Sequence, residues 1–261
     1  MRTALTIAGS DSGGGAGIQA DLKTFAAHGV YGTSAITAVT AQNTLGVTMF
    51  EALSADLVTA QIEAVVSDIG AHAVKTGMLA NAAIVEAVAA AIEALEIPWL
   101  VVDPVMIAKS GDRLVDDEAL GAMKSELLRR AFVITPNIPE AETLAGMIIT
   151  TDADRQDAAR RIHALGPAHV VIKGGHFPSS DIVDLLYDGE RFHEFRGERV
   201  EGRNTHGTGC TFAAAIASHL ALGITLEEAI PLSQQYVAGA IRSGPDLGKG
   251  HGPMDHFWSL Y

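Results

Sequence analysis

The stretch Leu5-Thr6-Ile7-Ala8-Gly9-Ser10-Asp11-Ser12-Gly13-Gly14-Gly15-Ala16-Gly17 joins a short apolar run to a glycine-rich turn. The apolar run predicts a buried strand at residues 5–8, and an amphipathic pattern predicts a helix at about residues 16–27. A phosphate-binding loop often occupies this position, but the turn has neither the Gly-Lys-Ser/Thr ending of a P-loop nor the glycine spacing of a dinucleotide fingerprint. Two interpretations stay open here: a flexible turn, or a close backbone approach to a small ligand.

The same alternation of strand-like and helix-like segments continues along the chain. Asp56 is expected to cap a helix that carries Leu57 and Ile62 on one side. Asp188-Gly189 predicts a hairpin between two late strands. Further strands are expected at residues 34–39, 47–53, 73–76, 100–102, 132–134, 170–172, 181–187 and 191–196. Further helices are expected at about residues 84–95, 116–128, 139–145, 154–165, 208–222 and 226–243.

This alternation predicts an α/β fold, with a central, mainly parallel sheet covered by helices on both faces. No linker or short repeat interrupts the 261 residues, 48% of which are hydrophobic. We therefore expect a single domain over residues 1–261.

The charge balance restricts the class of partner. Asp and Glu number 31 against 18 Lys and Arg, which gives a formal net charge of −13. A nucleic-acid-binding protein normally carries a basic face, so nucleic acid is not expected as a partner. Backbone amides and a few local cations can still hold a phosphate group inside an acidic protein. A nucleotide ligand therefore stays open.

Cysteine usage and apolar runs indicate the compartment. Cys210 is the only cysteine, so an intrachain disulfide is impossible and a reducing compartment is the simplest expectation. The first residues do not resemble a signal peptide. The apolar runs are shorter than the ~18–20 residues that span a bilayer. We expect a cytoplasmic protein that is not embedded in a membrane.

Polar or glycine-rich residues follow several predicted strands. In a parallel sheet the carboxyl ends of the strands meet at one edge, where ligands bind. Each of these residues could simply form a turn, but together they predict one common pocket. The strand ends are Gly9-Ser10-Asp11, Thr76-Gly77, Asp103-Pro104, Thr135-Pro136-Asn137 and Lys173-Gly174-Gly175.

A second glycine-rich segment, Thr205-His206-Gly207-Thr208-Gly209-Cys210, opens the helix expected at residues 208–222. Backbone N–H groups at such a helix start can stabilise a transferring phosphoryl group. The helix dipole is expected to lower the pKa of the Cys210 thiol and favour the thiolate. A buried, inert cysteine is the alternative, and His206 could equally be a capping or core residue.

The segment at residues 204–211 resembles the anion-hole signature of the ribokinase-like superfamily, whose last position is usually the aspartate that acts as catalytic base. In this sequence Cys210 occupies that position. With this cysteine and with residues 8–24, the sequence resembles the hydroxymethylpyrimidine/phosphomethylpyrimidine kinases of thiamine biosynthesis. The resemblance runs from about residue 5 to residue 257. Other matching motifs are Thr40-Ala41-Gln42-Asn43-Thr44, Lys75-Thr76-Gly77-Met78-Leu79, Asp103-Pro104-Val105-Met106, residues 135–142 and Gly250-His251-Gly252-Pro253.

The resemblance implies a ribokinase-like fold and a substrate pocket that includes Asp21, Gln42, Met78 and Val105. The carboxamide of Gln42 offers an acceptor beside a donor, which complements an aminopyrimidine edge. Met78 and Val105 would pack on the ring, although both could be ordinary core residues.

The resemblance also implies ATP and Mg²⁺ as cofactors. Asp103 and Glu140 match acidic positions that serve Mg²⁺ and its waters, and Mg²⁺ needs few protein ligands. Lys173 matches a position near the nucleotide phosphates. Asn137 and Thr205 are expected on the same cofactor side. The expected catalytic group is Gly207, Thr208, Gly209 and Cys210.

The implied activity is transfer of the ATP γ-phosphoryl group to 4-amino-5-hydroxymethyl-2-methylpyrimidine and then to its monophosphate. A pyridoxal-type vitamin kinase on the same fold is the nearest alternative, and a pyrimidine-binding sensor without turnover is another. A homodimer is expected because relatives form them.

Overall fold

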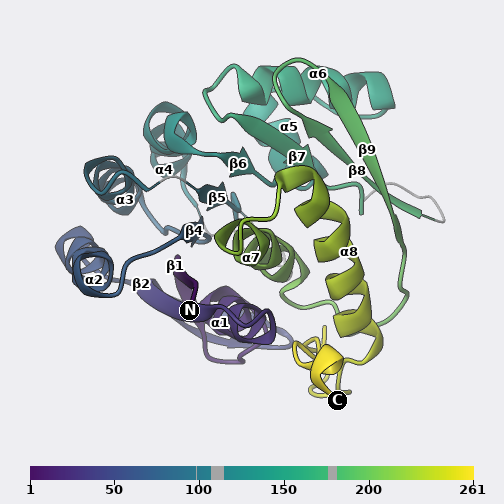
Figure 1. Cartoon of the computed structure of the whole chain (residues 1–261), viewed down its shortest axis with the longest axis horizontal. Helices are drawn as coiled ribbons and strands as arrows, with labels where there is room; N and C mark the ends of the chain where they lie inside the picture. Colours follow the sequence, from purple (N-terminus) through teal and green to yellow (C-terminus); the bar gives the residue numbers. More distant parts are fainter. Residues whose placement is uncertain (98, 107–114, 176–180) are drawn as a thin grey trace.

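The computed structural model describes residues 1–97, 99–106, 115–175 and 181–261, and the strands of this part of the chain form one sheet (Figure 1). The sheet order is β3-β2-β1-β4-β5-β6-β7-β8-β9. The strands are β1 (Thr3–Asp11), β2 (Tyr31–Asn43), β3 (Gly46–Ala52), β4 (Ala73–Thr76), β5 (Leu100–Val102), β6 (Val133–Ile134), β7 (His169–Ile172), β8 (Asp181–Tyr187) and β9 (Phe192–Glu198).

The centre of the sheet is parallel and its edges are antiparallel. Strands β2, β1, β4, β5, β6 and β7 pair in parallel, whereas β3, β8 and β9 pair antiparallel with their neighbours. Tyr187 pairs with Phe192 across the turn that contains Asp188 and Gly189, so the expected hairpin is confirmed. The prediction of a mainly parallel sheet is also confirmed.

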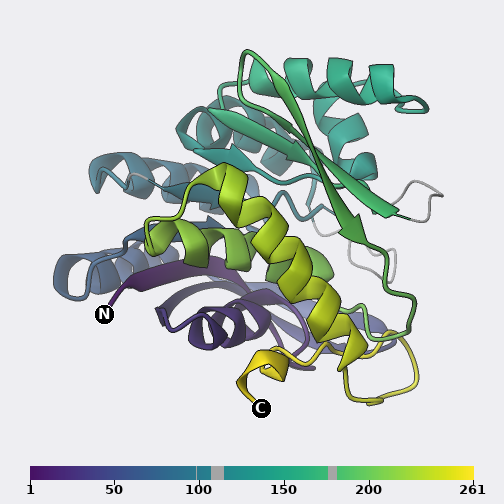
Figure 2. The ribbon, with the colours of Figure 1, turned by 45° about the vertical axis from the view of Figure 1, so that its right-hand side comes forward.

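Helices cover both faces of the sheet because successive strand residues point to opposite sides. In β1, Leu5 and Ile7 pack under one helical layer and Ala4 under the other. One layer contains α2 to α6, and α1, α7 and α8 form the other layer, which Figure 2 shows in a turned view. The helices are α1 (Gly17–Ala27), α2 (Ala55–Asp68), α3 (Ala82–Ala94), α4 (Asp117–Ala122), α5 (Ile138–Ala145), α6 (Asp152–His163), α7 (Thr208–Ala221) and α8 (Leu226–Arg242).

Two local expectations were wrong at the start of α2. The N-cap is Ser54, whose side chain accepts a hydrogen bond from the Leu57 N–H, and Asp56 lies in the first turn instead. Leu57 is 49% exposed, and Val58 and Ile62 form the buried stripe.

The helix expected at residues 116–128 is divided in the structure. After α4 the chain forms a π-helical turn, η1 (Met123–Leu127), and a 3₁₀ turn, η2 (Leu128–Arg130).

The strand ends place the polar residues of the sequence motifs along one edge of the sheet. Asp11 ends β1, Gln42 lies near the end of β2, and Asp103 directly follows β5. A last 3₁₀ turn, η3 (Trp258–Leu260), follows α8. Within the described residues, the helices are too short or too polar to cross a membrane.

Candidate active site

A cavity of about 760 Å³ lies at the carboxyl ends of the parallel strands. This volume is typical of a small-molecule site. The Met78 side chain lies over Gly9, since a Cβ added to Gly9 would lie 3.3 Å from the Met78 sulfur. The predicted site residues that line the cavity are Gln42, Met78, Asp103, Val105, Asn137, Glu140, Lys173, Thr205, Gly207, Thr208, Gly209 and Cys210.

The start of α7 provides backbone donors to the cavity. Gly207 caps the helix with φ of 82°, and the first intrahelical bond runs from the Thr211 N–H to the Gly207 carbonyl at 2.9 Å. The N–H groups of Thr208, Gly209 and Cys210 precede that bond and have no intrahelical acceptor. This geometry is suited to an anion.

The two glycine-rich turns pack against each other at this point. A Cβ on Gly207 would lie 1.9 Å from the Gly15 carbonyl oxygen, and a Cβ on Gly15 would lie 2.4 Å from the His206 ring. Either side chain would force the turns apart. The glycines therefore allow the first turn, at residues 9–17, to approach the helix start as closely as it does.

The Cys210 thiol lies in the cavity wall, but its expected pKa shift is reversed. Burial raises the pKa of Cys210 to about 12, and the Lys75 charge lowers it only in part. Asp103 and Asp21 add further negative potential that favours the protonated form. The helix start was expected to favour the thiolate, but the loss of water around the sulfur outweighs it.

Asp21 lies behind the cavity wall, and the structure does not bring it to the cavity as expected. Both its oxygens accept hydrogen bonds from Lys75 Nζ, at 3.0 and 2.9 Å, and Thr6 Oγ1 donates to it at 2.6 Å. Both ionic side chains are completely buried. Lys75 is the cavity-lining partner, and Asp21 raises its pKa although burial alone would lower it.

A second lysine–aspartate pair faces the cavity directly. Lys173 Nζ lies 3.3 Å from Asp103 Oδ1, and a Cβ on Gly209 would lie 3.3 Å from the same Nζ. Burial alone would lower the pKa of Lys173, but the charges of Asp103 and Glu140 raise it. The ammonium group thus stands charged beside the helix start.

Asn137 and Glu140 form a capping box at the start of α5. The Asn137 side chain accepts from the Glu140 N–H at 2.9 Å, and the Glu140 side chain accepts from the Asn137 N–H at 2.8 Å. Burial raises the pKa of Glu140 to about 7, Lys173 lowers it in part, and Asp103 raises it further. A nearby cation would stabilise the ionised carboxylate.

The acidic residues fit a magnesium site of the kind that retains several waters. Asp103 Oδ2 is buried and has no hydrogen-bond partner among the described residues, which leaves it available to a cation or a bound water. The described part of the chain holds no group of three or more acidic, histidine or cysteine side chains that could ligate a metal together. One or two carboxylates suffice for Mg²⁺ when phosphate oxygens and water complete its shell.

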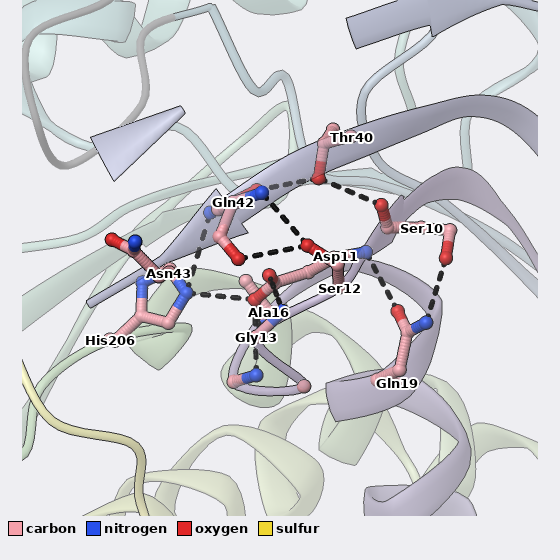
Figure 3. A network of polar contacts seen from close by, with 12 residues as sticks. Ser10, Asp11, Ser12, Gly13, Ala16, Gln19, Thr40, Gln42, Asn43 and His206 are labelled. Atoms are coloured by element: carbon pink, nitrogen blue, oxygen red, sulfur yellow. Dashed lines mark hydrogen bonds and ion pairs between the residues drawn. The ribbon is translucent and has the colours of Figure 1, made fainter. Parts of the chain in front are cut away.

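A polar network joins the first glycine turn to the wall that contains Gln42 (Figure 3). Asp11 Oδ2 accepts hydrogen bonds from the Gly15 N–H at 3.0 Å, the Ala16 N–H at 2.8 Å and His206 Nε2 at 2.8 Å. Burial alone would raise the pKa of Asp11, but His206 and the backbone donors lower it below its ordinary value. Asp11 is therefore an ionised acceptor that fixes this turn against His206.

Residues 247–252 form a strap that connects two walls of the cavity. The N–H groups of Lys249 and Gly250 each lie 3.2 Å from Thr44 Oγ1, near the β2–β3 turn. At the other end, the Gly252 N–H donates to the Arg203 carbonyl at 2.9 Å, and the His206 N–H donates to the Gly252 carbonyl at 3.0 Å. The strap therefore fixes the Gln42 wall relative to the helix start.

Sequence reasoning missed Asp11, Lys75 and the linking position of His206. Asp11 stood in a strand-end motif and Lys75 in a family motif, but neither was singled out for a role. The sequence does contain a signal for such residues: a charged residue at or near the end of an otherwise apolar strand. A charge that becomes buried there needs a partner, so such a residue indicates a polar contact.

Comparisons with known proteins show the family of this chain. The sequence model of the family described as phosphomethylpyrimidine kinase matches residues 11–255. The hydroxymethylpyrimidine/phosphomethylpyrimidine kinase of Bacillus subtilis is 50% identical over 255 residues, covering 97% of this chain and 94% of that protein. The thiamine biosynthesis bifunctional protein ThiED of Geobacter sulfurreducens is 51% identical over 252 residues. That match covers 97% of this chain but only 51% of the longer relative.

A solved structure confirms the expected ribokinase-like fold. The ADP complex of Bacillus subtilis pyridoxal kinase superposes with a TM-score of 0.92 at 40% identity, and the match covers 100% of this chain and 99% of that one. The family model matches most of the chain, and the Bacillus subtilis relative is similar over nearly its whole length. The chain belongs to the phosphomethylpyrimidine kinase family.

Proposed function

We propose that this protein transfers the γ-phosphoryl group of ATP to 4-amino-5-hydroxymethyl-2-methylpyrimidine, and then phosphorylates the resulting monophosphate to the diphosphate, in thiamine biosynthesis. One observation carries the proposal. A single cavity is lined both by Gln42, which can pair with an aminopyrimidine, and by the helix start at residues 207–210, which can hold a phosphoryl group. The name of the Bacillus subtilis relative gives both kinase activities, and the name of the Geobacter sulfurreducens relative gives thiamine biosynthesis.

The first step moves one phosphoryl group and one proton. The bond between the γ-phosphorus and its bridging oxygen breaks, ADP leaves with the electron pair, and the alcohol oxygen forms the new bond to phosphorus. Cys210 accepts the alcohol proton. The N–H groups of Thr208, Gly209 and Cys210, together with Lys173, stabilise charge on the transferring group.

The thiol of Cys210 begins protonated, so it first loses this proton to solvent water, and the resulting thiolate then accepts the alcohol proton and becomes a thiol again. The cations that favour the thiolate are Lys75, which is fully buried, and Lys173, whose side chain is 15% exposed. A thiolate derived from a thiol of high pKa is rare at neutral pH, but it is a strong base and is therefore well matched to an alcohol.

Asp103 and Glu140 would hold Mg²⁺ or its waters, and Asn137 would keep Glu140 in place through the capping box. When bound, Mg²⁺ offsets negative charge on the phosphate oxygens. Lys173 would then shift between Asp103 and the nucleotide phosphates. Thr205 lies next to this region, since Thr208 Oγ1 donates to its carbonyl at 2.7 Å.

The decisive experiment measures ATP consumption with each acceptor. We expect turnover with the hydroxymethylpyrimidine and with its monophosphate, each accompanied by the phosphorylated product in stoichiometric amount. A pyridoxal kinase would respond to pyridoxal instead, and a sensor without turnover would bind the pyrimidine but consume no ATP. Absence of pyrimidine-dependent ATP consumption by the folded protein would refute the proposal.

We also propose that the protein is a cytoplasmic homodimer that pairs through the β2–β3 edge. Large apolar side chains are exposed on and around this hairpin, including Met49 at 71% and Leu45 at 65%. Such side chains on an edge strand favour association. Analytical ultracentrifugation of the wild type and Met49→Glu tests this: a dimer is expected for the former and a shift toward monomer for the latter.

A further inference from the structure

The Gln42 carboxamide lies between two polar side chains of the network in Figure 3. Its nitrogen lies 3.4 Å from His206 Nε2, and its oxygen lies 3.2 Å from Thr40 Oγ1. Thr40 Oγ1 is also 2.9 Å from the Ser10 carbonyl oxygen, which can only accept a hydrogen bond. How the hydrogens of these groups are arranged decides what Gln42 offers to a ligand.

Asp11 determines where His206 carries its proton. His206 Nε2 lies 2.8 Å from the Asp11 carboxylate, an acceptor, so this nitrogen carries a hydrogen whether the ring is neutral or charged. His206 Nε2 is therefore a donor. A Gln42 nitrogen beside it would set two donors against each other across 3.4 Å.

Thr40 presents the same conflict from the other side. Its hydroxyl has one hydrogen, and the Ser10 carbonyl at 2.9 Å is the closer acceptor. Once that bond forms, the hydroxyl can only accept from Gln42, yet the carboxamide oxygen is itself an acceptor. The two ends of a carboxamide are nearly identical in shape, and their orientation follows from the network.

Exchanging the oxygen and nitrogen of Gln42 satisfies every group. The single hydrogen of His206 Nε2 is then shared in a three-centre bond between the Asp11 carboxylate, at 2.8 Å, and Gln42 Oε1, at the 3.4 Å position. Gln42 Nε2 donates to Thr40 Oγ1, and Thr40 donates to the Ser10 carbonyl. This uses one lone pair and one hydrogen of the carboxamide. The second lone pair and the second hydrogen stay available to the cavity that Gln42 lines.

We infer that Asp11, His206 and Thr40 are positioning residues that lock the Gln42 carboxamide in one orientation and so select a 4-aminopyrimidine over its 4-oxo counterpart. The free lone pair of Oε1 accepts from the exocyclic amine, and the free hydrogen of Nε2 donates to the adjacent ring nitrogen. In a 4-oxopyrimidine the donor and acceptor are reversed, so the same locked carboxamide would face two mismatched groups. The inference rests on the proposed function.

The test compares two acceptors that differ only at these positions: 4-amino-5-hydroxymethyl-2-methylpyrimidine and its 4-oxo analogue. The measured quantity is the ratio of their kcat/KM values, in which a shared loss of catalysis cancels. A parallel ratio of Kd values from titration calorimetry does not require turnover. If the enzyme proved inactive on the amino compound, the proposed function would fail, while the ratio of Kd values would still test the lock.

His206→Phe removes the donor and retains an aromatic ring against Gly15. We expect it to reduce the amino/oxo ratio at least roughly tenfold, the effect of one hydrogen bond of about 1.4 kcal/mol. His206→Gln, which can still donate from its amide, should restore part of the ratio. If His206→Phe does not fold, Thr40→Val removes the other constraint on the carboxamide and should lower the same ratio.

Ser12→Ala is the matched control. Ser12 Oγ bonds to the backbone N–H and carbonyl of Gln42, both at 2.8 Å, and does not bond to the carboxamide. We expect its amino/oxo ratio to stay within twofold of the wild type. The inference is overturned if His206→Phe and Thr40→Val leave both ratios unchanged, or if Ser12→Ala lowers them as much as His206→Phe does.

Discussion

The buried pair between Lys75 and Asp21 gives the sharpest prediction for stability. Both side chains are fully buried, and Lys75 Nζ contacts both oxygens of the carboxylate. Lys75→Met keeps the length of the side chain but removes its charge. Asp21 would then have to stay ionised without a cation or take up a proton, and either change costs folding free energy.

The expected magnitude follows from this geometry. Two unit charges 2.9 Å apart attract by about 6 kcal/mol at an effective dielectric constant of about 20. Desolvation offsets much of this in the intact pair, but removing one partner of a buried pair typically costs about 3–5 kcal/mol. For a chain of this size that corresponds to a Tm lower by roughly 6–20 °C.

Urea unfolding and thermal melting measure the loss, and Arg161→Met supplies the control. Arg161 Nε lies 3.0 Å from Asp157 Oδ2, with both side chains about half exposed, so its loss should cost under about 1 kcal/mol. The double variant Lys75→Met/Asp21→Asn removes both charges and should recover at least half of the loss. The reasoning is refuted if Lys75→Met costs no more than Arg161→Met, or if the double variant is no more stable than Lys75→Met.

Three further predictions follow from single features of the structure. Because the pKa of Cys210 is raised to about 12, the first phosphorylation should accelerate about tenfold per pH unit above neutrality, whereas the second, with an acceptor that is already anionic, should not. Cys210→Ala should abolish that slope in rapid-quench assays; a slope that survives the substitution would show that another base acts. Gly207→Ala should abolish activity and lower the Tm, because its Cβ would meet the Gly15 carbonyl; an active, stable variant would contradict the close approach of the two turns. Burial lowers the pKa of His219 to about 4, so the unfolded chain binds more protons between pH 6.5 and 4, and stability should fall across that window as the pH decreases. His219→Leu should flatten the pH dependence of the urea midpoint, and an unchanged dependence would assign it to other groups.

The features best predicted from the sequence are those that one continuous segment of chain determines. The strands at residues 73–76 and 100–102 match β4 and β5, because central parallel strands are buried on both faces and are apolar throughout. The residues expected at the site also line the cavity apart from Asp21, since the carboxyl ends of parallel strands meet at one edge. Their individual roles stay predictions.

Features that depend on distant pairing were not predicted. Asp11 gains its position from His206, 195 residues away, and Asp21 is withdrawn from the cavity by Lys75, 54 residues away. The raised pKa of Cys210 also depends on distant residues. The helix start is a local feature that the sequence predicts, but the burial that raises the pKa comes from segments far away in the chain. The α2 cap shows the limit of local rules: Ser54 and Asp56 are both capping residues, and the extended backbone at Ser54 decides between them.

The strap at residues 247–252 has a consequence for the order of events during synthesis. Its two bonds to Thr44 join the side chain of that residue to backbone groups 205 and 206 residues later in the chain. At a translation rate of about 5–20 residues per second, roughly 10–40 s pass between the emergence of the two partners. Throughout that interval the nascent chain contains the Gln42 wall of the cavity but lacks the segment that fixes it. Ribosome-bound chains that end before residue 247 should therefore not form a complete acceptor site, however much of the sheet has already folded.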